Sequence, residues 1–139
     1  MSRRILVVEN NPENLELMRY LLHSFGHATL SAHNGEEGVA ITSRERPRLV
    51  LCDINMPRLD GYGVVRALKS DPKLRRIPLM AVTALAMVGD RDKILAAGFD
   101  GYIGKPIDPT TFVPDIEMFL DQRRLHSSPL TARRGQHRA

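Results

Sequence analysis

Polar side chains that could handle a phosphoryl group follow four short apolar runs of the sequence. They are the pair Glu9-Asn10, then Asp53, Thr83 and Lys105. Carboxylate and carbonyl oxygens are the hard ligands that Mg²⁺ prefers, and a carboxylate beside such a metal can attack phosphorus to form an acyl phosphate. An ammonium and a hydroxyl add the charge neutralisation and hydrogen bonding on which phosphoryl transfer depends. This chemistry requires all four segments to meet.

The pattern of the chain predicts how they meet. Apolar runs alternate with amphipathic stretches, which predicts strands near 5–8, 28–32, 49–53, 79–83 and 102–103, and helices near 12–25, 35–46, 61–70, 88–97 and after 108. This alternation favours a parallel sheet covered on both faces. Five such units in about 120 residues fit a doubly wound (βα)5 sheet, because an eight-unit barrel needs ~250 residues. Ligands of such sheets bind beyond the carboxyl ends of the strands, where the four segments fall.

The sequence predicts the start of the first helix and leaves two possible starts for the last helix. The first helix has Asn11 as its cap and Pro12 at its first position, with a core face that we expect to run from Leu15 to Phe25. The last helix either begins after a cap at Asp108, with Pro114 distorting its interior, or begins later.

These motifs together resemble the receiver domain of two-component response regulators, of the single-domain, chemotaxis-regulator-like kind. The resemblance covers about residues 3 to 121 and rests on the run 5–9 ending in Glu9, on Asp53 with Met56-Pro57 and Gly61, on Thr83-Ala84, and on Lys105-Pro106. It implies a flavodoxin-like α/β fold with strand order 2-1-3-4-5. It also implies a phosphoacceptor switch rather than a conventional enzyme, one that assists its own Mg²⁺-dependent phosphorylation and dephosphorylation.

The resemblance assigns a role to each residue of the site. Asp53 is the phosphoacceptor, Lys105 and Thr83 contact phosphoryl oxygens, and Thr83 and Tyr102 form the switch. A cis Lys105-Pro106 peptide is expected to aim the lysine. The metal ligands are Glu9, Asn10, Asp53 and the backbone carbonyl of Asn55.

The resemblance also implies partners. The phosphoryl donor is a sensor histidine kinase or a histidine phosphotransfer protein, and a downstream protein reads the surface of helix 4, strand 5 and helix 5. Dimer formation on phosphorylation is a further expectation that the sequence leaves open.

One position departs from the family pattern. The strand-1 acidic pair of the family is Glu9-Asn10 here, and asparagine offers Mg²⁺ a neutral oxygen in place of a carboxylate. We therefore expect weaker Mg²⁺ binding. The alternative is a degenerate receiver that acts as a phosphate-independent interaction module, which the retained Asp53, Thr83 and Lys105 disfavour. A flavin carrier is a poor fit, because no Gly/Ser/Thr-rich phosphate loop follows the first strand.

The distribution of charge along the chain and the chain length predict the domain organisation. The 139 residues carry a net charge of +4 and a pI near 9.6, but five arginines and no carboxylates lie in 122–139. We therefore expect a near-neutral receiver domain at 1–121 and a basic, disordered tail at 122–139 without a binding role. With no output domain, no DNA-binding domain, no membrane segment and no leader expected, the sequence predicts a stand-alone cytoplasmic protein.

Overall fold

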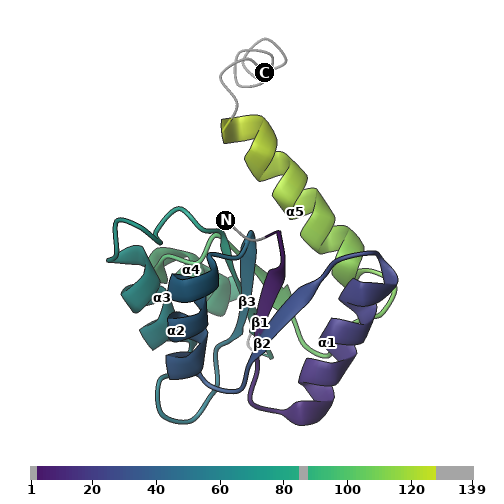
Figure 1. The fold of residues 1–139 in the computed structure, drawn as a ribbon, viewed down its shortest axis with the longest axis horizontal. Coiled ribbons are helices and arrows are strands. Elements are labelled where there is room, and N and C mark those ends of the chain that lie inside the picture. The colour runs from purple at the N-terminus through teal and green to yellow at the C-terminus, as the bar shows by residue number, and fades with distance from the viewer. Residues whose placement is uncertain (1–2, 85–87, 128–139) are drawn as a thin grey trace. The chain divides into compact units, whose positions relative to one another are not determined.

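The computed structural model describes residues 3–84 and 88–127 and contains the predicted alternation of strands and helices (Figure 1). The strands are β1 (Ile5–Val8), β2 (Thr29–Ala32), β3 (Leu49–Asp53), β4 (Leu79–Thr83) and β5 (Gly101–Gly104). The helices are α1 (Pro12–Ser24), α2 (Gly35–Glu45), α3 (Gly61–Lys69), α4 (Val88–Ala97) and α5 (Phe112–Ser127). The chain divides into two compact units, residues 1–107, which contain the whole sheet, and residues 108–139.

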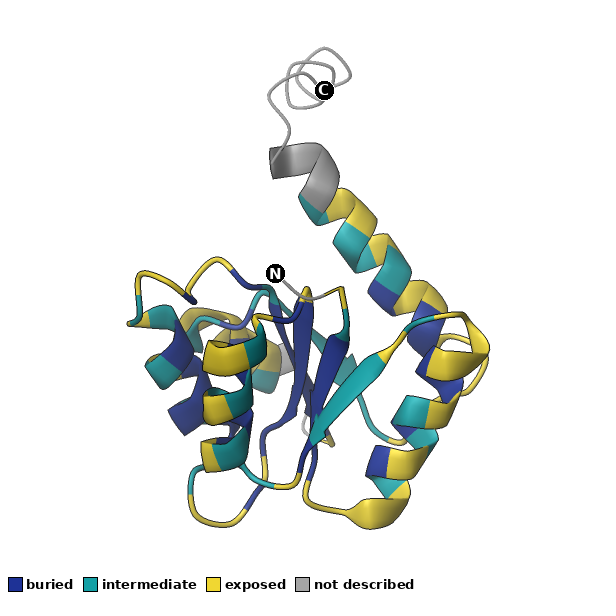
Figure 2. Ribbon diagram, viewed as in Figure 1, coloured by how far each residue is buried: buried dark blue, intermediate teal, exposed yellow. Residues whose placement is uncertain are grey.

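The five strands are parallel and lie in the order β2-β1-β3-β4-β5, which confirms the predicted fold class. Every residue of β1, β3 and β4 is buried, whereas the edge strands are mostly half-buried (Figure 2). Near-continuous apolar runs such as Ile5–Val8 are what a strand needs when helices cover both of its faces. In the first unit α2, α3 and α4 lie on one side of the sheet and α1 lies on the other (Figure 1).

The main core lies between the sheet and α2, α3 and α4. Alternate strand residues such as Val8, Val50 and Cys52 pack there with Val64 and Ile94. Cys52 is a core residue, as the sequence suggested, and its burial raises the pKa of the thiol. The cysteine is therefore packing, not chemistry.

Helix caps set the direction in which each helix leaves the sheet. The Asn11 side chain accepts hydrogen bonds from the backbone N–H groups of Glu13 and Asn14, which satisfies two of the donors that open α1. The Asn34 side chain accepts one such bond from the Glu37 N–H of α2, and the Asp60 side chain accepts one from the Gly63 N–H of α3. Three helices thus begin at the carboxyl edge of the sheet, close to the candidate site.

The structure decides three details of the helices: the exposure of Phe25, the start of α5 and the end of α5. The expectation that Phe25 belongs to the core face of α1 was wrong. Phe25 is the C-cap of the helix and is 47% exposed, and Leu21 is buried with Leu15, Met18 and Leu22 instead. Helix α5 begins at Phe112, so Pro114 occupies its third position, where a backbone N–H has no partner within the helix. The same helix continues to Ser127, beyond the predicted end at residue 121, and residues 128–139 lie outside the described residues.

Close packing of α2 against the loop before α3 depends on a glycine. A Cβ built at Gly35 would lie 2.1 Å from the backbone carbonyl oxygen of Leu59, whereas one built at Gly89 in α4 would meet nothing within 4 Å. We expect Gly35→Ala to destabilise the fold by about 2–3 kcal/mol through overpacking. Gly89→Ala is the matched control and should stabilise it by about 0.5–1 kcal/mol, since alanine is the better helix former.

Urea unfolding followed by circular dichroism measures both effects. Equal changes in the two variants would contradict the close packing seen at Gly35.

Candidate functional site

The sheet register brings the predicted site residues to one edge. Val8 pairs with Cys52, Asp53 pairs with Val82, and Thr83 pairs with Gly104. Glu9 and Lys105 are the residues that follow β1 and β5, so the carboxyl ends of four adjacent strands converge. The geometry meets the sequence expectation that these side chains are neighbours.

Two carboxylates and one ammonium form the centre of the site. The Lys105 Nζ atom lies 3.0 Å from Glu9 Oε1 and 3.3 Å from Asp53 Oδ2. Glu9 is fully buried and Asp53 is nearly so, whereas Lys105 is half-buried. Bringing two carboxylates together in a buried place is unfavourable unless a cation separates them, and Lys105 supplies that cation.

The two acidic side chains are also oriented by backbone donors. The Asn11 backbone N–H donates to Glu9 Oε2 at 3.2 Å, and the Asn55 backbone N–H donates to Asp53 Oδ1 at 3.2 Å. Glu9 Oε1 is different. It is buried and, among the described residues, accepts no well-aligned hydrogen bond, although Lys105 lies near it as an ion pair. The site therefore contains one carboxylate oxygen with a free acceptor position.

Burial and charge perturb both ends of the Glu9–Lys105 pair. Burial is the largest cause that raises the pKa of Glu9, and the neighbouring Asp53 adds to it, while Lys105 and the Asn11 N–H oppose them. For Lys105, burial favours the neutral form, but Glu9 and Asp53 outweigh it, so the pKa of the ammonium is raised. Lys105 is therefore a permanent cation at neutral pH.

The loop after β3 clamps Asp53 from the other side. The Gly61 N–H donates to the Ile54 carbonyl oxygen at 2.9 Å, and a Cβ at Gly61 would lie 2.7 Å from Ile54 Cα and 2.9 Å from the Asp53 carbonyl oxygen. Met56 is buried within the same loop. The run from Asp53 to Gly61 is thus a compact turn that fixes the acidic residue at its start.

Thr83 ends β4, Tyr102 lies within β5, and Lys105 follows β5. Thr83 is buried, and its carbonyl oxygen accepts the Lys105 backbone N–H at 2.8 Å. The Lys105-Pro106 peptide bond is cis, as expected. Tyr102 is half-buried and packs against the main core, with the guanidinium carbon of Arg91 5.6 Å from the centre of its ring. Asn10 and Asn55 are exposed.

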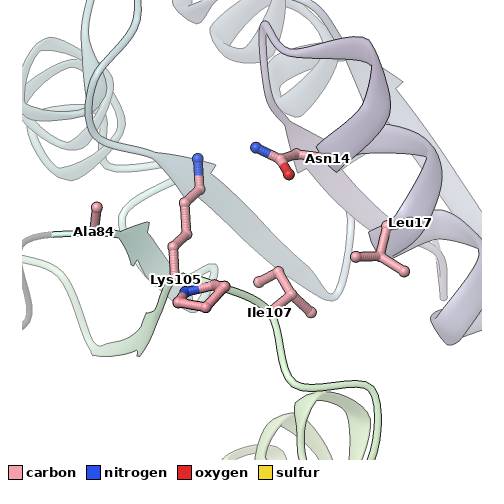
Figure 3. Close-up of a pocket in the computed structure, with 6 residues that line it drawn as sticks. Asn14, Leu17, Ala84, Lys105 and Ile107 are labelled. Atoms are coloured by element: carbon pink, nitrogen blue, oxygen red, sulfur yellow. The ribbon is translucent and has the colours of Figure 1, made fainter.

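A pocket of about 380 Å³ adjoins the charged centre (Figure 3). It is lined by Asn14, Leu17, Ala84, Lys105, Pro106 and Ile107. The Asn14 side chain points toward the side where the Lys105 ammonium lies (Figure 3). The sequence analysis missed Asn14, Leu17 and Ile107. The one available signal was helical spacing, since Asn14 and Leu17 are three residues apart and lie outside the apolar stripe of α1.

Comparison with known proteins decides the family. The family model described as the response regulator receiver domain matches residues 5–117. The chain belongs to this family. The polar-differentiation response regulator DivK of Brucella anthropi is 39% identical to it over 120 residues, which cover 86% of this chain and 98% of that protein.

Two solved structures show how far the receiver likeness extends. The receiver domain of a sensor histidine kinase from Pseudomonas aeruginosa, described with a magnesium ion coordinated in its active-site cleft, is 31% identical. The TM-score is 0.78, with 87% of this chain and 99% of that chain covered. The chemotaxis protein CheY4 of Vibrio cholerae has a TM-score of 0.79 at 21% identity over 86% of this chain and 99% of that one, so it shows the fold alone.

The receiver site offers Mg²⁺ what it prefers, which is oxygen. Glu9 Oε1 lacks an aligned donor, and Asp53 supplies a second carboxylate. No group of three or more His, Cys, Asp or Glu side chains able to hold a metal occurs in residues 3–84 and 88–127. Two carboxylates suit an ion that keeps several waters, but not one that needs a complete protein cage.

The raised pKa of Glu9 makes a prediction about stability in the absence of metal. An acid with a raised pKa in the folded state binds its proton more tightly when folded, so wild-type stability falls as the pH rises from 4.5 through the raised value. Glu9→Gln imitates the neutral form. In EDTA, the free energy of unfolding of this variant minus that of wild type should increase between pH 4 and pH 7. The increase should be about 1.4 kcal/mol for each pH unit by which folding raises the pKa of Glu9.

Urea titrations at several pH values measure this gain. Glu16→Gln, which changes an exposed residue of α1, is the control and should show no such pH-dependent gain. A difference between Glu9→Gln and wild type that does not vary with pH would show that burial does not perturb Glu9.

Proposed function

We propose that this receiver accepts a phosphoryl group on Asp53 and uses it to switch its contacts with other proteins. The single observation that carries the proposal is the arrangement of Lys105 between two buried carboxylates, 3.3 Å from Asp53 Oδ2. That cation stands where negative charge builds up when a phosphoryl group joins Asp53. Phosphoryl transfer depends mainly on such positioning and charge neutralisation.

The transfer is an exchange of one bond to phosphorus for another. A carboxylate oxygen of Asp53 forms a bond to phosphorus while the phosphorus–nitrogen bond of a phosphohistidine breaks. The electron pair of that bond stays on the leaving imidazole nitrogen, and the product is an acyl phosphate on Asp53. Lys105 holds a phosphoryl oxygen by charge, and the Thr83 hydroxyl hydrogen-bonds to another.

Magnesium is the cofactor that we propose for this site. Glu9, Asp53 and the Asn55 carbonyl would hold it, with Asn10 as a neutral ligand. When bound, the ion neutralises phosphoryl oxygens that Lys105 does not reach. Asn10 brings no charge, so the site carries one negative charge fewer than a site with two acidic residues after β1. We infer from this that the affinity for Mg²⁺ is reduced.

The donor is a histidine kinase or a histidine phosphotransfer protein. In support, the pocket beside Lys105 opens on Leu17, Pro106 and Ile107, which offer apolar contact to a helix that carries the donor histidine. The name of the Brucella relative, a response regulator, agrees with this class of function. Retention of Asp53, Thr83 and Lys105 in one site weighs against the phosphate-independent module.

Switching is proposed to pass from Thr83 to Tyr102 and so to α4, β5 and α5. Thr83 is buried beside the site, and Tyr102 lies on the neighbouring strand with Arg91 of α4 over its ring. Movement of Thr83 toward the phosphoryl group would open space for the tyrosine. A downstream protein would read the result. The division into a receiver at 1–121 and a tail from 122, a place in the cytoplasm, and dimer formation on phosphorylation remain predictions.

Phosphorylation by a small donor tests the proposal directly. The protein incubated with Mg²⁺ and acetyl phosphate should gain one phosphoryl group in intact-mass spectrometry, and Asp53→Ala should gain none. Asp92→Ala, which removes an exposed carboxylate of α4, is the control and should be labelled like wild type. If neither acetyl phosphate nor phosphohistidine donors label the protein, the phosphate-independent module is the better description.

The role of Asn10 makes a separate prediction. Asn10→Asp restores a carboxylate and should tighten Mg²⁺ binding on the order of tenfold, because ligand charge sets cation affinity. Titration calorimetry with MgCl₂ measures it. Asn34→Asp, which adds the same charge at a helix cap that aspartate serves equally well, should change the affinity little. Equal affinities in Asn10→Asp and wild type would remove the proposed weakness of the site.

A further inference from the structure

The end of the sheet opposite Asp53 carries a row of arginines, which we call the arginine edge. Strands β1, β3 and β4 are neighbours in the sheet, and a pair of arginines stands just before each of them. The Arg48 backbone N–H donates to the Arg4 carbonyl oxygen at 3.0 Å, so the first two pairs are joined directly. The six residues are Arg3, Arg4, Arg46, Arg48, Arg75 and Arg76.

Most of these side chains are available to a partner. All but Arg4 are exposed, and those five have no ion pair with any residue in the described parts of the chain. In Figure 1 the start of β1, the link from α2 to β3 and the loop after α3 all lie at the upper end of the sheet. The strands end at the lower edge, where Asp53 and Glu9 lie. Six of the fifteen lysines and arginines in residues 1–107 therefore precede strands at the edge away from Glu9 and Asp53.

The chain itself shows which group fits this edge. The Glu45 carboxylate is held by Arg4 of this edge, with Oε1 2.6 Å from Arg4 Nη2, and by Arg44 outside it, with Oε2 3.2 Å from Arg44 Nε. The row is built from arginine alone, and the guanidinium fork matches a carboxylate in two-point contacts that a lysine cannot make. Glu45 occupies only one end of the row, which leaves the pairs at 46/48 and 75/76 for other carboxylates.

The small width of the row selects among polyanions. Three adjacent strands span only about 10 Å at ~4.8 Å per strand. That is short for a nucleic acid duplex, whose affinity comes from many phosphate contacts. The exposed large apolar residues of the described chain are Tyr20, Phe25, Leu95 and Met118, and none lies in this row. A bilayer contact would thus lack the second, apolar signal that stable membrane binding needs.

We propose that the arginine edge binds an extended acidic segment of a partner protein, with several carboxylates in close succession. Strands of five residues place this edge about 15 Å from the phosphoacceptor edge. A partner can therefore stay tethered here while Asp53 is phosphorylated and dephosphorylated.

An octaglutamate peptide with a fluorescent label is the probe, and an octaglutamine peptide is its neutral control. In fluorescence anisotropy at low salt the full chain should bind the glutamate peptide only, and 0.5 M NaCl should abolish binding because it screens exposed charges. Arg75→Gln with Arg76→Gln, and separately Arg46→Gln with Arg48→Gln, should each weaken binding roughly fivefold. Circular dichroism checks that both variants fold.

Matched variants separate the arginine edge from net charge. Arg58→Gln with Lys93→Gln removes the same charge from exposed positions elsewhere and should change binding less than twofold. An equal loss in this control, or a loss only in Arg133→Gln with Arg134→Gln, would overturn the proposal. Tighter binding to a DNA duplex or to phosphatidylglycerol vesicles at the same salt would also overturn it. So would salt-sensitive self-association, measured by sedimentation, that buries the arginine edge between two copies of the chain.

Discussion

The contact on which the rest of this structure depends is a single ammonium between two buried carboxylates. Asp53 ends β3 and Glu9 follows the adjacent β1, so the sheet register places the two carboxylates side by side despite their like charge. Their repulsion in a buried place would favour protonation, and the pKa of Glu9 is indeed raised by burial and by Asp53. The Lys105 ammonium offsets the repulsion between the two carboxylates. Two carboxylates and one ammonium leave the site with one net negative charge, and Glu9 Oε1 lacks an aligned donor, so the site suits a cationic ligand.

Much of the fold supports that one contact. Caps at Asn11, Asn34 and Asp60 start three helices at the same edge of the sheet and set the direction in which the chain leaves β1, β2 and β3. Gly61 allows the loop after β3 to fold back onto Asp53 at distances that a side chain would forbid. Every residue of β1, β3 and β4 is buried, so the strands that lead to the site are packed on both faces. Preorganisation of this kind would let a few polar groups act in the proposed phosphoryl transfer without a cost of rearrangement.

The order and type of the elements could be predicted because they depend on local sequence. Four-residue apolar runs, asparagine caps and glycines after helices each act within a few residues of themselves, and they predicted five strands, five helices and the convergence of Glu9, Asp53, Thr83 and Lys105. The failures lie where longer-range packing decides. Phe25 has the spacing of a core residue, yet the helix ends one residue before it and Leu21 takes the buried place. The continuation of α5 to Ser127 has no apolar periodicity to announce it.

Charge shows most clearly what an average over the sequence hides. The net charge of +4 appeared to belong to residues 122–139, since the rest of the chain is close to neutral. Near-neutrality of a sum does not require neutrality in space. The parallel topology puts every strand start on one edge and every strand end on the other, so arginines that precede β1, β3 and β4 gather while the carboxylates of the site gather opposite them. Pairs at 3/4, 46/48 and 75/76 are far apart in the chain, and only the strand order 2-1-3-4-5 makes them neighbours. The same topological rule that assembles the site of Glu9, Asp53 and Lys105 therefore assembles a second charged surface, and the two have opposite sign because different residues flank the two ends of each strand.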